Sequence, residues 1–249
     1  MNENDKEKDF RLSFPKDIMQ LMDGFFNTSF AADIDRLQQG VKHPAIILNE
    51  RMKLLTNAEG QHSPVGIDIP VLIKTEQAEP KATVVLLGQD PLRKCMDIER
   101  DKCLDHAFIG TPYRIHHTDG LPPATRVYPK LIKRLLEQGY NVYLTDVRKY
   151  FPSSSNKAAK EQGLTNVDLL VNELHCLSGT LILVLSGAQA QRFFEQNKKR
   201  LENVVTSGHV VCLPHLSGFG ASKQWRSRID CATQDKKMEY IMNQINELS

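Results

Sequence analysis

The sequence predicts an α/β fold in three layers, α/β/α, with a central, mainly parallel four-stranded sheet. Four short, continuous apolar segments indicate strands buried on both faces, as in parallel sheets. Longer segments with helical periodicity alternate with them, which is the pattern of βαβ units. The chain has 249 residues, 41% hydrophobic and 25% charged, and this composition is typical of a globular protein with one sizeable core.

Residues 1–81 are predicted to form a tail and a helical extension packed on the core. The first residues are charged, so we expect a frayed tail there. Apolar residues then recur at helical spacing, with a break near Asn27-Thr28, which favours two amphipathic helices. The expected segments are a tail at 1–11, two helices within 14–39, a helix within 44–55, an extended segment at 65–74 and a polar connection at 76–81.

Residues 82–249 are predicted to form the α/β domain. The strands are expected at 83–87, 141–145, 180–185 and 209–213, and the helices at 124–138, 165–177, 188–203 and 233–248. Right-handed crossovers place the carboxyl end of every parallel strand at one edge of the sheet, where open α/β sheets bind their ligands. The residues expected at this edge are Gly88 to Asp90, Asp146, Ser186-Gly187 and His215.

Net charge, cysteine spacing and the distribution of apolar residues indicate which partners and cofactors to expect. A net charge of +2 permits a nucleic-acid partner without implying one. The five cysteines form no Cys-x-x-Cys pair, which fits reduced thiols in a cytoplasmic protein. Cys95, Cys103 and His106 match no common zinc spacing, so we expect no metal and no other cofactor. The amino terminus does not resemble a signal peptide and no apolar run approaches the ~20 residues of a membrane helix, so no membrane partner is expected.

Two short motifs directly follow predicted strands. Gly88-Gln89-Asp90-Pro91 ends the first strand, where Gly88 permits a close approach of the backbone and Pro91 stiffens the turn. Pro214-His215-Leu216-Ser217-Gly218 follows the last strand. Taken singly, Asp90 could cap amides in a turn and His215 could be an ordinary loop histidine. A carboxylate and an imidazole at the carboxyl ends of parallel strands can instead face one crevice, and together they predict a site.

These motifs resemble those of the uracil-DNA glycosylases. Gly88-Gln89-Asp90-Pro91 is similar to the first motif of the family, and Pro214-His215-Leu216-Ser217 is similar to its second, histidine-led motif. Three more segments resemble the family: Phe108-Ile109-Gly110, where an aromatic ring stacks on the extruded base; Tyr143 to Lys149, where a strand end presents a base-reading Asn; and Leu183 to Ala188. The likeness covers about residues 82–248 and does not explain the residues before it.

The resemblance implies a monofunctional DNA glycosylase that acts on uracil or a related deaminated or oxidised pyrimidine, in single- or double-stranded DNA. Asp90 would stabilise positive charge on the sugar and orient the attacking water. His215 would donate a hydrogen bond to the base oxygen that gains charge, with backbone N–H groups near Gln89. Gly88 would let the backbone approach the base, and Phe108 would stack on it unless it is an ordinary core aromatic. No lysine adjoins the motifs in an apolar setting, so Schiff-base chemistry is not expected.

Three positions depart from the family pattern. Leu92 stands where many members have a Tyr that crowds the C5 position of the base, so exclusion of thymine is not implied. Tyr150 stands where iron–sulfur members have a cluster cysteine, so no cluster is expected. Asp146 replaces the base-reading Asn. An Asn amide offers one donor and one acceptor to the uracil edge, whereas an ionised Asp146 offers acceptors only.

Protonation would give Asp146 a donor. Burial and repulsion from Asp90 would favour the protonated form by raising the carboxylate pKa values. A protonated Asp146 could serve either uracil or cytosine, so the sequence leaves the substrate base open. The alternative is that Asp146 caps a helix or pairs with Arg148.

DNA contacts are expected from cationic and hydroxyl side chains that flank the motifs, because such groups bind phosphate without reading sequence. The candidates are Arg93, Lys94, Arg148, Lys149, Ser153 to Ser155, Ser217, Lys223 and Arg226. Leu216 or Phe219 is expected to wedge into the duplex in place of the extruded base. The alternative is a surface loop with one buried Phe.

Two other functions stay open, and we expect a monomer in each case. The first is a nucleic-acid-binding protein of the same fold that has lost turnover, which the unusual Asp146 and Leu92 motivate. The second is a hydrolase of free nucleosides, although the sequence contains no P-loop and no Gly-x-Gly-x-x-Gly cradle for phosphate.

Overall fold

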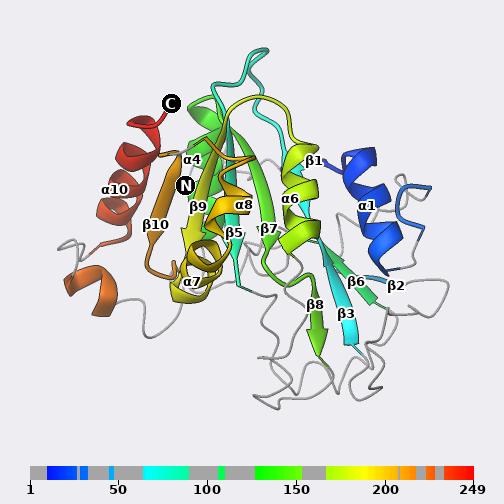
Figure 1. The fold of residues 1–249 in the computed structure, drawn as a ribbon. Helices are drawn as coiled ribbons and strands as arrows, with labels where there is room; N and C mark the ends of the chain where they lie inside the picture. The colour runs from blue at the N-terminus through cyan, green and yellow to red at the C-terminus, as the bar shows by residue number, and fades with distance from the viewer. Residues whose placement is uncertain are drawn as a thin grey trace.

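The computed structural model places two β-sheets and their covering helices around one main core (Figure 1). The residues that the structure describes are 10–26, 29–32, 45–47, 64–89, 106–109, 127–152, 167–206, 208–216, 223–227 and 233–249. Within these residues no helix is long and apolar enough to cross a membrane.

The main sheet has six strands in the order β1-β4-β7-β5-β9-β10. Its central parallel strands are β7 (Asn141–Asp146), β5 (Thr83–Gly88), β9 (Leu181–Ser186) and β10 (Val210–Leu213). They lie where strands are predicted, because continuous apolar segments suit strands covered on both faces. The predicted number of strands is wrong. At the β7 edge, β4 (Val71–Ile73) pairs antiparallel with β7, and β1 (Leu12–Ser13) pairs antiparallel with β4.

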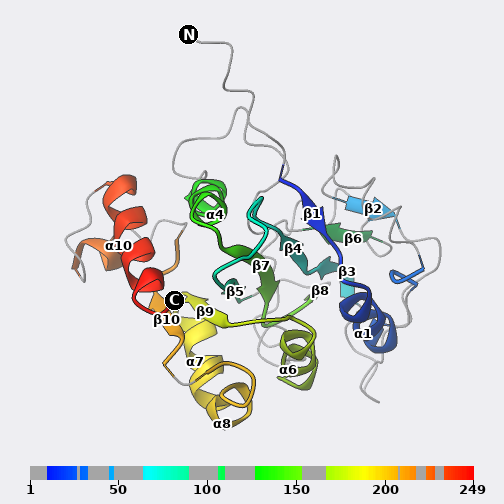
Figure 2. The same ribbon diagram turned by 90° about the horizontal axis from the view of Figure 1, so that it is seen from above.

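Helices cover both faces of the main sheet (Figure 2). One face carries α4 (Val127–Glu137) and α10 (Gln234–Asn246), and the other carries α6 (Val167–His175), α7 (Ala188–Gln196) and α8 (Lys198–Leu201). Each lies within a predicted helix, but the helix predicted at 188–203 is divided at Asn197. The Asn197 side chain donates to the Phe193 carbonyl at 2.9 Å, and this local bond competes with continuation of the helix.

The amino-terminal region belongs to the same core. Helix α1 (Lys16–Phe26) packs against α6 and buries Ile18, Met19 and Met22 completely. The first predicted helix is therefore present, whereas the second falls largely outside the described residues. Together β1 and β4 extend the main sheet, so the region before residue 82 supplies strands as well as a helix.

A second sheet was not predicted. Its order is β2-β6-β3-β8, and its strands are β2 (Ala45–Ile47), β6 (His106–Ile109), β3 (Pro64–Ile69) and β8 (Tyr150–Pro152). The helix predicted within 44–55 is wrong for β2, because these residues pair antiparallel with β6. The extended segment predicted at 65–74 is present as β3 and β4.

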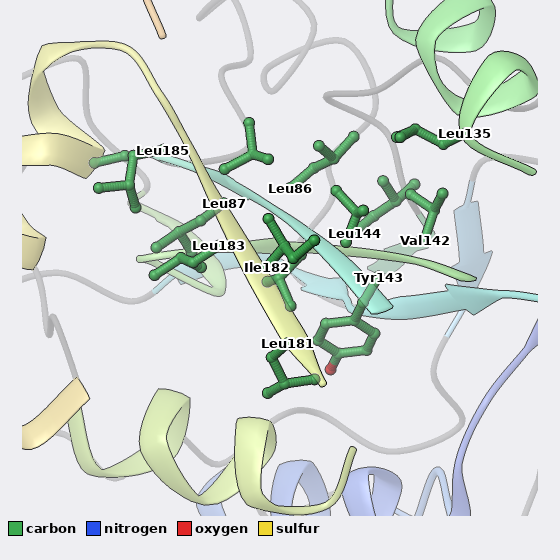
Figure 3. Packing of buried hydrophobic residues seen from close by; sticks show 14 of the residues in the cluster. Leu86, Leu87, Leu135, Val142, Tyr143, Leu144, Leu181, Ile182, Leu183 and Leu185 are labelled. Atoms are coloured by element: carbon green, nitrogen blue, oxygen red, sulfur yellow. The ribbon is translucent and has the colours of Figure 1, made fainter. Parts of the chain in front are cut away.

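The alternation of β7 decides which face of the main sheet each side chain meets. Figure 3 shows Val142 and Leu144 on the side of Leu135 of α4, while Tyr143 points the opposite way. Because successive side chains of a strand point to opposite faces, Thr145 follows Tyr143 and Asp146 follows Leu144. The end of β7 therefore presents one polar side chain to each face.

Candidate active site at the carboxyl edge of the sheet

The loops after β5 and β7 are joined by backbone hydrogen bonds. Gly88 lies in register with Asp146 across the two strands. Beyond them, the Val147 N–H donates to the Gly88 carbonyl at 3.0 Å, and the Arg148 N–H donates to the Gln89 carbonyl at 3.1 Å. Three predicted site residues, Gly88, Gln89 and Asp146, are therefore adjacent. Asp90 is the next residue of the first loop and lies outside the described residues.

The loops after β9 and β10 are joined in the same way. The Gly187 N–H donates to the Leu213 carbonyl at 2.9 Å, and the Gln191 side chain donates to the same carbonyl at 2.7 Å. Gly187 has a φ of 91°, and a Cβ built on it would stand 3.2 Å from Cδ2 of His215. A glycine at this position therefore leaves space for the imidazole. His215 itself is exposed at the edge of the sheet.

Trp225 contacts the loop that carries His215. Its side chain is completely buried in a short helical segment at residues 223–227, and its indole Nε1 donates to the His215 carbonyl at 3.2 Å. Its ring meets Tyr240 edge-on, with the centroids 6.2 Å apart, and the Lys237 ammonium lies 5.6 Å from the centroid of the indole. Sequence reasoning missed this residue, and the available signal was that it is the one Trp of the chain.

Asp146 is the last residue of β7 and is 2% exposed. The helix-cap alternative is wrong, because the chain continues from β7 into β8. Near it, the Tyr128 and Ser186 hydroxyl groups hydrogen-bond at 2.9 Å. Burial raises the pKa of Tyr128 to about 12; the bond to Ser186 lowers it and the charge of Asp146 raises it further. A polar cluster that includes the Asp146 carboxylate thus lies on the α4 side of the sheet.

Lys149 is 4% exposed and lies on the α6 side. Its ammonium group forms an ion pair with Glu173 of α6 at 2.8 Å. It also donates to the Asp146 carbonyl at 2.6 Å and to the Thr145 hydroxyl. This geometry argues against the predicted contact between Lys149 and a DNA phosphate, because the charge is turned inward and already paired.

Glu173 accepts the other hydrogen bonds of this buried cluster. Its Oε1 accepts hydrogen bonds from the Tyr143 hydroxyl at 2.6 Å and from the Thr145 hydroxyl at 2.5 Å. Burial, and then the charge of Glu173, raise the pKa of Tyr143 well above 10, so its hydroxyl remains a donor. Sequence reasoning did not find Glu173, which lies inside a helix and is not part of any motif.

Of the other predicted site residues, the structure describes some and leaves others outside the described part of the chain. Leu216 is 3% exposed, so it is packed into the core rather than projecting as a wedge. Lys223 is exposed and Arg148 is half-buried. The backbone of Phe108 lies in β6, opposite Ala45 and Asp68, and its side chain is not described. The predicted residues outside the described part are Asp90, Arg93, Lys94, Ser153 to Ser155, Ser217 and Phe219.

Fold and site together define an α/β protein whose polar residues gather at the carboxyl edge of a parallel sheet. Comparison with protein families matches residues 75–241 to the uracil DNA glycosylase superfamily. The match covers more than half of the chain, so the protein belongs to this superfamily. The resemblance that the motifs indicated is confirmed. A comparison with individual curated proteins gave no match.

Proposed function

We propose that the protein is a monofunctional DNA glycosylase that hydrolyses the N-glycosidic bond of uracil or of a related damaged or deaminated base. The observation that carries the proposal is that Gly88 and Gln89 of the first motif, Asp146 and His215 lie at one edge of the sheet in a member of this superfamily. Open α/β sheets bind their ligands at this edge.

The chemistry follows from the charge that develops as the bond breaks. The C1′–N bond breaks with its electron pair leaving on the base, while water adds its oxygen to C1′ and gives its proton to Asp90. The proton is then lost to solvent, and solvent supplies the proton that neutralises the departed base. Asp90 orients this water and stabilises the positive sugar. His215 donates a hydrogen bond to the base oxygen that gains negative charge, and backbone N–H groups near Gln89 assist. Support comes from the exposed His215, whose carbonyl accepts a hydrogen bond from Trp225 and whose ring lies beside Gly187.

Recognition of the base is assigned to the first loop, to Phe108 and to Asp146. Gly88 and Gln89 supply backbone at the pocket, and Phe108 supplies the face on which an extruded base stacks. Asp146 reads the base edge. Its burial supports this assignment, because a buried polar group discriminates strongly between matched and mismatched partners.

DNA is held through its phosphates by Arg93, Lys94, Arg148, Ser217 and Lys223. Lys149 leaves this group because its ammonium is buried. Between the two candidate wedges we favour Phe219, since Leu216 is packed inside.

The test is a panel of single- and double-stranded oligonucleotides, each with one modified base. Release of a free base supports the proposal. On the best substrate, Asp90→Asn and His215→Ala are each expected to lower the single-turnover rate by ~10² or more while DNA binding stays nearly intact. His175→Ala is a matched control, because this exposed histidine ends α6 at the opposite edge of the sheet and is expected to leave the rate unchanged.

A second candidate function is binding of nucleic acid without turnover. Asp146 in place of the base-reading Asn favours it. Tight binding to the panel with no released base would establish this alternative, and activity on free nucleosides alone would point to a small-molecule hydrolase instead.

A further inference from the structure

A closed polar cluster lies directly behind the base-reading end of β7. It consists of Tyr143, Thr145, Lys149 and Glu173, each of which is at most 4% exposed. Burying an ion pair removes two charges from water, so such a pair is weak evidence for stability alone. Its position next to Asp146 raises the question of a second role.

Hydrogen bonds and one ion pair join the members of the cluster. A lysine ammonium has three donors, and those of Lys149 meet the Thr145 hydroxyl, the Asp146 carbonyl and Oε2 of Glu173. Oε1 of Glu173 accepts from the two hydroxyl groups of β7, at 2.6 Å from Tyr143 and 2.5 Å from Thr145. A buried network of hydrogen bonds and an ion pair restricts its members to few geometries.

The hydrogen bond from Lys149 to the Asp146 carbonyl links the cluster to the residue that is proposed to read the base. That carbonyl and the Val147 N–H belong to the same planar peptide unit. Lys149 holds one side of the unit at 2.6 Å, and the Gly88 carbonyl holds the other side at 3.0 Å. With the peptide plane held at both edges, the main-chain direction at Asp146 is fixed, and with it the direction of the side chain on the other face of the sheet.

We propose that the Lys149–Glu173 ion pair is a positioning device for base selection: through the Asp146 carbonyl it sets the orientation in which the Asp146 side chain meets the base. The inference rests on the proposed function, because it assumes that Asp146 reads a base. Neither residue of the pair touches the substrate. Since Glu173 lies on α6, the pair also ties the site to the helix against which α1 packs.

Two variants separate stability from positioning. Lys149→Met removes every donated bond and leaves the Glu173 charge buried and unpaired, so it is expected to destabilise strongly. The double variant Lys149→Met/Glu173→Gln removes both charges, and its Gln oxygen still accepts from Tyr143 and Thr145. We expect the double variant to recover most of the lost stability in urea unfolding, yet it still lacks the donor to the Asp146 carbonyl.

The first measurement is amide hydrogen exchange at Val147 and Arg148, which requires no substrate. In the folded double variant both amides are expected to exchange about tenfold faster or more, because the peptide unit is held from one side only. Wild-type exchange at both amides in the double variant would overturn the proposal.

The second measurement is the ratio of single-turnover rates on uracil- and cytosine-containing strands. We expect the double variant to change this ratio by about fivefold or more, because the Asp146 side chain is no longer held in register with the base edge. Faster exchange with an unchanged ratio would also overturn the proposal, since the pair would then serve stability alone.

Tyr140→Phe is the matched control. Tyr140 precedes β7 at its opposite end, is completely buried, and donates its hydroxyl to Asn246 at 2.9 Å and to Ser249 at 2.7 Å. Losing these bonds is expected to reduce stability without changing the amide exchange or the rate ratio. If Tyr140→Phe changed both as much as the double variant does, a general loosening of the protein would explain the effects and the proposal would be overturned. If the wild-type protein releases no base from any strand, the proposed function fails, while the exchange experiment still decides whether the pair orders this edge.

Discussion

At the scale of single residues, the proposed function makes Asp146 the position on which base selection depends. Asp146→Asn supplies one donor and one acceptor, which match O4 and N3–H of uracil. We expect the rate on uracil to rise relative to cytosine by about tenfold to a hundredfold, because each unpaired buried polar group costs ~1–3 kcal/mol. The measurement is a pH series of single-turnover rates on both strands, in which the variant should also lose any requirement for a protonated carboxylate.

The result would contradict base reading by Asp146 if the rate ratio and its pH profile were the same in variant and wild type. In that case Asp146 would serve the cluster with Tyr128 and Ser186 rather than the substrate.

Gly187 offers a second test at the same scale. Gly187→Ala is strained at a φ of 91°, and its Cβ would press on the His215 ring at 3.2 Å. We expect a stability loss of ~1–3 kcal/mol and a fall in the single-turnover rate of about tenfold, as His215 is displaced. Gly208→Ala is the control, because its φ is 93° and no atom of the described residues lies within 4 Å of the added Cβ. Equal rates in the two variants would show that the position of the imidazole does not limit the reaction.

At the scale of elements, the helical segment at 223–227 supports the histidine loop through Trp225. Trp225→Phe keeps an aromatic ring but removes the hydrogen bond to the His215 carbonyl. We expect a stability loss of ~1–3 kcal/mol, and a lower kcat with little change in KM, because in the proposed function the loop holds the group that acts on the departing base.

Lys237→Met is the matched control for this element. It removes the cation that lies above the Trp225 ring and leaves the indole hydrogen bond in place. If both variants lower kcat to the same extent, the indole hydrogen bond is not what positions the loop.

At the scale of the whole molecule, the amino-terminal helix is part of the core that carries the site. Met19 on α1 is completely buried, and Met19→Ala is expected to lower the free energy of unfolding by ~2–5 kcal/mol. Urea unfolding should show one transition shifted to lower denaturant, since α1 packs on α6. The neighbouring Gln20→Ala is the control, as Gln20 is exposed. A separate early transition that leaves the site active would mean that α1 folds independently.

The sequence by itself determined the central strands and the edge at which the candidate site lies. Continuous apolar segments are a local pattern, and the handedness of crossovers then places their carboxyl ends together. Gly88, Gln89, Asp146 and His215 lie at the edge predicted for them, and the comparison confirms the family. Asp90 and Phe108 remain predictions, because the structure does not describe their side chains.

Tertiary structure decided the features that depend on partners distant in the chain. The strand β1 is too short to stand out in the sequence, and it forms by pairing with β4, which in turn pairs with β7. Lys149 looked like a phosphate ligand, but Glu173 on another element draws its ammonium inward. Trp225 and Gly187 matter because they meet His215 in space. The sequence does not show which groups a charged or aromatic side chain will contact. Packing between elements far apart in the chain decides whether burying that side chain is favourable.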